Sequence, residues 1–113
     1  VQFALADLMP ETEEVDPDQI IQAVANQFDV TLEELFSRSR SHRIALPRQV
    51  AMYLLREESD LSLPKIGEFL CDRDHTTVMY GHEKITDLLE TDKKLRRKVI
   101  NVKEALYGAP IMA

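Results

Sequence analysis

Apolar residues recur at helical intervals along most of this 113-residue chain. Between residues 17 and 28 they fall on one helical face, at Ile20, Ile21, Val24 and Phe28. A second such face, between residues 92 and 107, is formed by Leu95, Val99, Val102 and Leu106. Spacings of three and four residues place these side chains on the buried side of amphipathic helices. Because no segment alternates apolar and polar residues as a strand does, the sequence predicts an all-α protein of six or seven helices.

Residues with strong positional preferences mark the predicted helix ends. Asp16 before Pro17 is a cap followed by a first helical position, and Thr31 with Glu34 forms a capping box. Further helices are predicted to start at Pro47 and after the capping residues Ser62 and Asp74. The last helix is predicted to start at residues 91–92 and to end at Gly108. The polar, basic segment 37–46 has no apolar period and is predicted to be a loop.

The chain divides into three parts at these signals. Residues 1–14 are predicted to form a short connector helix and an acidic linker that contains Pro10. Residues 15–108 form the compact helical domain, and residues 109–113 are a C-terminal tail. Because the chain begins at Val1, we expect it to be part of a longer protein.

Two of the predicted helices are joined by a turn of only three residues, 71–73. The second of these helices opens with polar residues: Asp74, His75, Thr76 and Thr77. A short turn between two such helices is typical of a helix-turn-helix, although the pattern alone is weak evidence. Gly81 inside the second helix costs helix stability, and either close helix packing or close approach to DNA would explain it.

The net charge of −6 would argue against binding to a polyanion, but the charges are distributed unevenly along the chain. Residues 1–35 hold nine acids and no Lys or Arg, whereas all 14 Lys and Arg lie in residues 36–113 with the other 11 acids. Between Arg38 and Arg48 there are four arginines, one histidine and no acid. Local rather than net charge governs binding to phosphates, so this segment is a candidate for contact with nucleic acid. A second basic cluster, in residues 93–98, is better explained as the solvated face of the last helix.

The polar start at residues 74–77 has two interpretations. It is either a cap with a solvated first turn, or the first turn of a helix that reads DNA. Backbone N–H groups and the positive end of the helix dipole favour phosphate there, and threonine and histidine suit contacts with base edges. The basic segment upstream strengthens the second interpretation.

Catalytic and metal-binding alternatives find little support. His82-Glu83 lacks the second histidine of a zinc-protease motif, and Cys71 has no cysteine partner at metal-binding spacing. No glycine-rich phosphate loop occurs among the three glycines. The single cysteine excludes an internal disulfide, as in proteins of the reducing cytoplasm, and no apolar run reaches the length of a membrane span.

The segment RDHTTV (residues 73–78), followed by Lys84-Ile85, resembles the signature of the DNA-binding domain of the DnaA family, the bacterial chromosomal replication initiators. The resemblance extends over LPKIGEFL, PRQVAMYLLRE and the basic segment SRSRSHRIAL, and covers roughly residues 17–107. It implies a TrpR-like helix-turn-helix fold and sequence-specific binding of double-stranded DnaA boxes at the replication origin.

The resemblance also implies roles for individual residues. Base contacts are expected from Arg40 in the minor groove and, in the major groove, from Asp74, His75, Thr76, Pro64 and Met79. Contacts with the DNA backbone are expected from Arg38, His42, Arg43, Arg48, Gln49, Arg56, Lys65, Arg73, Thr77 and Tyr80. The chain departs from the family at Cys71-Asp72, where two glycines are usual, and at His42 and Tyr80. The turn is therefore expected either to differ in backbone from that of the family or to need a positive φ at Asp72.

The ATPase region of the family, with its ATP or ADP and magnesium, lies outside this chain. We therefore expect that this chain has no enzymatic activity, binds no cofactor or metal and does not contact a membrane. We also expect a cytoplasmic, nucleoid-associated location and binding of DNA as a monomer. Other protomers would be met through the ATPase region. Two alternatives remain: a helix-turn-helix transcription regulator that binds palindromic sites as a dimer, and a helical protein-interaction module that uses the acidic N-terminal third.

Overall fold

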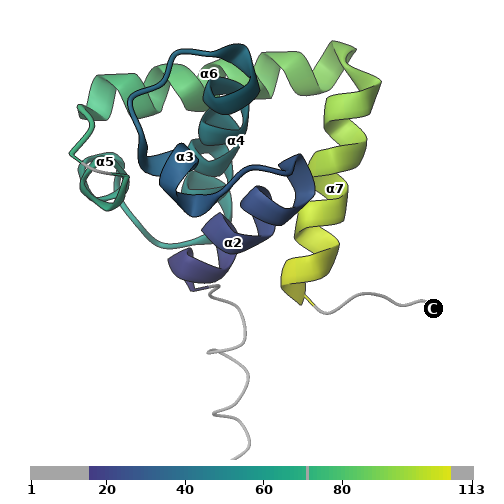
Figure 1. Ribbon diagram of the computed structural model, residues 1–113, viewed down its shortest axis with the longest axis horizontal. Helices are drawn as coiled ribbons and strands as arrows, with labels where there is room; N and C mark the ends of the chain where they lie inside the picture. Colours follow the sequence, from purple (N-terminus) through teal and green to yellow (C-terminus); the bar gives the residue numbers. More distant parts are fainter. Residues whose placement is uncertain (1–15, 71, 108–113) are drawn as a thin grey trace, which may run out of the picture.

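The computed structural model describes residues 16–70 and 72–107, in which all regular secondary structure is helical (Figure 1). Six helices follow one another in these residues: α2 (Pro17–Phe28), α3 (Leu32–Phe36), α4 (His42–Glu58), α5 (Leu63–Phe69), α6 (His75–Thr91) and α7 (Lys93–Tyr107). The all-α prediction is confirmed. The predicted connector helix and the C-terminal tail lie outside the described residues.

Side-chain caps hold the predicted starts of α2, α3 and α5. A carboxylate oxygen of Asp16 accepts the Asp18 N–H at 3.0 Å. In the capping box, the Thr31 hydroxyl accepts the Glu34 N–H, and the Glu34 carboxylate accepts the Thr31 N–H, both at 3.0 Å. Ser62 accepts the Lys65 N–H at 3.4 Å. These bonds satisfy donors that have no partner within the helix, and so fix where each helix begins.

The start of α4 corrects a prediction. The sequence predicted a loop over residues 37–46 and a helix from Pro47, but α4 begins at His42 and contains Pro47. Proline lacks the N–H that would bond to the carbonyl four residues earlier, which is a local cost. Ile44 is only 3% exposed and Pro47 is itself buried, so packing of this extra turn against the core offsets the cost. Tertiary burial overrides the local signal at this position.

The core is built mainly where α4 meets its neighbours. In Figure 1, α6 runs along the top of the molecule, α7 descends from its end, and α2 lies at the bottom. Helix α6 packs mostly on α4 and α5, while α2 packs on α7 and α4. The predicted apolar faces supply the fully buried side chains, among them Ile20, Val24, Val50, Leu54, Leu55, Ile66, Leu70, Val78 and Ile85. Buried Val78 and Ile85 fasten α6 to this core and leave its first turn at the surface.

Close packing explains the glycine inside α6. A Cβ atom built on Gly81 would lie 2.6 Å from the sulfur of Met52 and 3.4 Å from Cγ of Gln49. Both of these residues belong to α4, so the two helices approach closely here, and an added Cβ would require the Met52 side chain to move. Helix packing therefore accounts for Gly81 without contact with DNA.

Candidate nucleic-acid interface

The turn that precedes α6 is held tightly against α5. The N–H of Arg73 donates to the Gly67 carbonyl at 2.8 Å, and Asp72 has the positive φ, 57°, expected of it. A Cβ atom on Gly67 would lie 2.0 Å from the Arg73 carbonyl oxygen. The turn thus needs a glycine at residue 67 of α5, a requirement that spacing along the sequence did not reveal.

The first turn of α6 presents the predicted base readers together at the surface. Asp74 occupies the N-cap position, as predicted, but its side chain makes no capping hydrogen bond. Its carboxylate instead accepts the Thr76 hydroxyl and lies 3.4 Å from Nδ1 of His75. The hydroxyl of Thr76, and to a smaller degree the neighbouring His75, lower the pKa of the Asp74 carboxyl. Asp74 therefore remains an ionised acceptor, and it orients its two neighbours.

Exposed apolar and aromatic groups extend this polar turn along α6. Met79 and Tyr80 are 42% and 60% exposed, and they follow Thr76 by three and four residues. That spacing puts all three side chains on adjoining parts of the helix surface. Pro64 and Lys65 in the first turn of α5 are also exposed, as is Thr77. Apolar surface beside polar donors and acceptors suits base pairs that carry a thymine methyl group.

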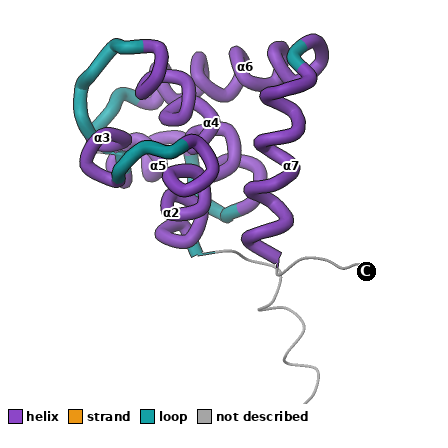
Figure 2. Tube along the Cα trace, turned by 45° about the vertical axis from the view of Figure 1, so that its right-hand side comes forward, coloured by secondary structure: helices purple, strands orange, loops and turns teal. Residues whose placement is uncertain are grey.

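The segment before α4 is an extended loop fixed by its own serines; we call residues 37–41 the basic loop. The hydroxyl of Ser37 donates to the Glu34 carbonyl at 2.7 Å and accepts the Ser39 N–H at 3.3 Å. Ser39 in turn accepts the Ser41 N–H at 3.2 Å. Figure 2 shows the loop as the long irregular arc between α3 and α4. The residues between the serines, Arg38 and Arg40, are exposed.

Arg48 holds the basic loop from inside the fold. Its side chain is buried, with 7% of the residue exposed. Nε donates to the Leu35 carbonyl at 3.0 Å, and Nη1 donates to the Ser39 carbonyl at 2.9 Å. Burial, followed by the positive charge of Arg73, lowers the pKa of Arg48. The structure therefore places Arg48 under the loop, where it holds carbonyl groups, and not on the surface where a phosphate would lie.

Arg73 connects the basic loop with the turn before α6. Its Nη2 atom donates to the Ser37 carbonyl, while its backbone N–H is bonded to α5. The basic loop thus meets α5 and the turn before α6, which are distant from it in sequence, at one arginine. The candidate interface consists of the basic loop, the first turn of α6 and the start of α5.

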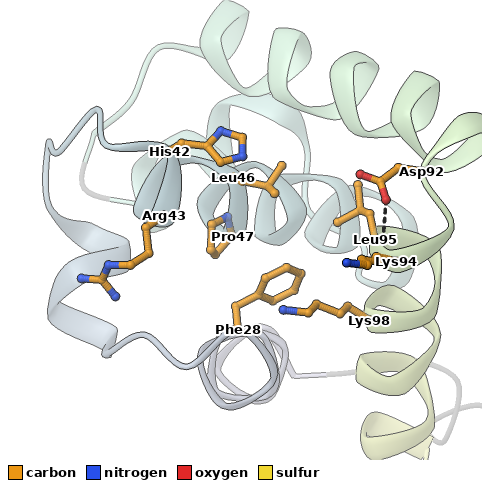
Figure 3. A pocket seen from close by; sticks show the side chains of 9 residues that line it. All are labelled: Phe28, His42, Arg43, Leu46, Pro47, Asp92, Lys94, Leu95 and Lys98. Atoms are coloured by element: carbon orange, nitrogen blue, oxygen red, sulfur yellow. Dashed lines mark hydrogen bonds between the residues drawn. The ribbon is translucent and has the colours of Figure 1, made fainter.

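Four further residues predicted to contact the DNA backbone lie in α4. Nη2 of Arg43 is 2.7 Å from the Glu34 carboxylate, and this ion pair adds to the Thr31 N–H in lowering the pKa of Glu34. His42 and Arg43 line a hollow of about 280 Å³ at the end of α2, together with Phe28 and the first turn of α7 (Figure 3). Gln49 is half-buried beside Gly81, and Arg56 is exposed in the last turn of α4.

Across residues 16–70 and 72–107, no three His, Cys, Asp or Glu side chains form a cluster suited to a metal ion. None of the helices in these two ranges combines the length and the apolar character needed to cross a bilayer.

The interface lies within a region that matches a known family. Residues 17–85 match the family described as "Bacterial dnaA protein helix-turn-helix". The Chromosomal replication initiator protein DnaA of Herpetosiphon aurantiacus is 47% identical over 107 residues, which cover 93% of this chain and 23% of the relative. The protein of the same name from Chloroflexus aggregans is 46% identical over 105 residues, covering 91% of this chain and 22% of the relative. The chain therefore spans less than a quarter of the length of these curated relatives.

Proposed function

The chain belongs to the DnaA family of bacterial replication initiators, as a helix-turn-helix domain, and we propose that it binds double-stranded DnaA boxes at the replication origin. Within the parent protein this binding would serve the initiation and regulation of chromosome replication. The parent would carry out its work in the cytoplasm, and would use ATP or ADP, magnesium and contacts with further protomers through a region outside this chain.

The observation that carries the proposal is the exposure of two differently shaped groups of side chains on one connected surface. The first turn of α6 offers hydrogen-bonding groups on the end of a helix, which fits the width of the major groove. The basic loop offers Arg38 and Arg40 on an extended backbone, which suits the narrower minor groove and its negative potential. Because Arg73 joins the two segments, one duplex can meet both at once.

Each group of residues has its own role in this proposal. Asp74, His75 and Thr76 read base edges in the major groove, with Met79 and Pro64 against thymine methyl groups. Arg40 reads the adjacent minor groove, while exposed cationic and polar residues position the phosphates, which gives affinity but no sequence information. The residues proposed for the phosphates are Arg38, Lys65, Thr77 and Tyr80.

A titration with two labelled duplexes tests the proposal. Fluorescence anisotropy of a DnaA-box duplex and of a scrambled duplex, each at two salt concentrations, separates sequence-specific from electrostatic binding. We expect the box to bind more tightly at both salt concentrations, and both affinities to fall as salt rises. Equal affinity for the two duplexes would reject sequence-specific reading, and binding that is absent or insensitive to salt would favour a protein-interaction module. A requirement for a palindromic site and two protomers would favour a dimeric transcription regulator.

A further inference from the structure

Two guanidinium groups from different parts of the fold hold the basic loop. Arg48 reaches it from α4 and donates to the carbonyls of Leu35 and Ser39. Arg73 reaches it from the turn before α6 and donates to the carbonyl of Ser37. An extended segment without regular secondary structure would otherwise sample many conformations, and ordering it on DNA would reduce affinity. The two arginines order it before DNA arrives.

Arg73 differs from Arg48 in what it connects. Arg48 ties the loop to the interior of the domain, whereas Arg73 ties it to the residue pair that leads into α6. The Arg73 backbone is fixed on Gly67 of α5 at 2.8 Å, and the next residue, Asp74, begins the base-reading turn. A displacement of the turn therefore moves the donor that holds Ser37. Because Ser37 is hydrogen-bonded to Ser39, and Ser39 to Ser41, the displacement also moves the backbone that carries Arg40.

We infer that Arg73 is a positioning residue that couples the minor-groove reader Arg40 to the major-groove reader Thr76. This inference rests on the proposed function, because it concerns how the same surface reads DNA. The coupling requires a donor that is held in a fixed direction toward the Ser37 carbonyl, which the planar guanidinium provides, while the backbone N–H of Arg73 remains on α5. A lysine keeps the charge for a phosphate but offers a flexible point donor, so it does not replace the arginine.

A double-mutant cycle tests the coupling. Affinity for the box duplex is measured for the whole chain, for Arg40→Ala, for Thr76→Ala and for the double variant. If Arg40 and Thr76 are coupled, removing one side chain already weakens the base contact of the other. The double variant should then lose about fivefold less affinity than the product of the two single losses. The same cycle in an Arg73→Lys background should become additive. In an Arg97→Lys background, where the exposed arginine lies on α7, the coupling should stay.

The outcomes separate this inference from the proposed function. Box preference in the unchanged chain, combined with an additive cycle, would overturn the coupling and leave DNA reading intact. Coupling that persists in Arg73→Lys would show that Arg73 does not carry it. No box preference in the unchanged chain would overturn both. Because the first cycle needs no change at Arg73, an additive result there overturns the inference even where Arg73→Lys fails to fold.

A measurement without DNA tests the mechanical part of the inference. Trypsin cleaves after Arg38 and Arg40 only when the loop leaves the conformation that its hydrogen bonds to Arg48 and Arg73 hold. Mass spectrometry identifies these cuts. We expect Arg73→Lys to speed cleavage at both sites about tenfold below its unfolding temperature, because the local opening becomes easier. The matched Arg97→Lys should cleave there at the rate of the unchanged chain. Equal rates in all three proteins would show that the Ser37 contact does not hold the loop.

Discussion

The domain has two basic regions, and they use similar residues differently. In the basic loop, the serines and Arg48 bind backbone groups and leave Arg38 and Arg40 at the surface of an irregular segment. In the other region, residues 93–98 of α7, the Arg96 guanidinium also donates to carbonyl groups, those of Leu89 at 2.9 Å and Glu90 at 3.1 Å. These hydrogen bonds cap the end of α6.

The two sets of hydrogen bonds differ in the kind of backbone that they hold in place. Under the loop, the hydrogen bonds fix a backbone that has no order of its own, and so determine where two exposed arginines stand. On α7 the helix already orders the backbone, and its lysines are spread around a solvated face; Lys98 lies 4.9 Å above the ring of Phe28. Residues 93–98 hold five cationic side chains and the basic loop only two, but only the loop holds its charges at positions fixed by hydrogen bonds to the backbone. The predictions below change one region at a time.

Among the substitutions at the DNA interface, Gly67→Ala should have the largest effect on stability and box binding. Its Cβ would lie 2.0 Å from the Arg73 carbonyl oxygen, a backbone atom that can move only if the turn moves. We expect a loss of stability of about 3 kcal/mol and loss of box preference, measured by thermal unfolding and anisotropy. Gly81→Ala is the control, because its close neighbour is the end of a flexible Met52 side chain and alanine favours the helix. Equal destabilisation by both substitutions would contradict the special role of the turn.

Arg48→Met compares directly with Arg96→Met. Removing Arg48 leaves buried carbonyls without a charged donor, so we expect a stability loss of about 2 kcal/mol and weaker box binding. Arg96 grips exposed carbonyls that water can solvate, so its loss should cost about 0.5 kcal/mol and leave box binding unchanged. Chemical denaturation and anisotropy measure both effects. The comparison fails if Arg96→Met weakens box binding as much as Arg48→Met does.

Arg40→Ala and Thr76→Ala should act on recognition rather than stability. Each is expected to cost about 1–3 kcal/mol of binding to the box and little on scrambled DNA, because base contacts carry the sequence information. Both side chains are exposed, so the unfolding temperature should hardly change. Parallel titrations with the two duplexes measure the difference. Identical losses on box and scrambled DNA would remove these residues from the base-reading set.

Lys94→Ala on α7 should have a smaller effect, without sequence preference. We expect binding to both duplexes to weaken by less than about 0.5 kcal/mol, since a solvated charge away from the interface acts only through the screened field. Arg38→Ala, by contrast, should reduce the slope of affinity against salt by about one counterion. A larger change of slope from Lys94→Ala than from Arg38→Ala would reverse the assignment of the two regions.

The smallest expected effect is on the titration of Asp74. The Thr76 hydroxyl lowers the pKa of this carboxyl, so Thr76→Val should raise the pKa toward its ordinary value. A lowered pKa means that the ionised form favours the folded state above the ordinary pKa, and that this contribution disappears as pH falls through the lowered value. Carbon-detected NMR of the carboxyl group follows the titration. An unchanged titration midpoint would show that the Thr76 hydroxyl does not hold Asp74.

Sequence reasoning found most of the helices because they depend on local signals, such as the capping box at Thr31. The roles of the surface residues and the positive φ of Asp72 were expected from the resemblance to the family, which usually has two glycines at this turn. The start of α4 could not be found in this way, because burial of Ile44 decides it against the preference of Pro47. The role of Arg48 was also hidden, since only the folded chain shows which arginine of a basic segment lies beneath it.

One feature of the loop is visible in the sequence, where arginines alternate with serines. The alternation in Ser37–Ser41 has the period of an extended backbone, on which alternate side chains point to opposite sides. The serines face the chain that they bind, and the arginines face outward. Gly67 offered no comparable signal, because its requirement arises from contact with a turn six residues later.

The most direct test of the account is an NMR titration of the whole chain with a DnaA-box duplex. The central claim is that the basic loop and the first turn of α6 form the DNA interface, and that the basic face of α7 does not. We predict the largest amide shift changes in residues 37–41 and 74–80, with only small changes in residues 93–98. Shift changes centred on residues 93–98, with the loop and the first turn of α6 unmoved, would contradict the account.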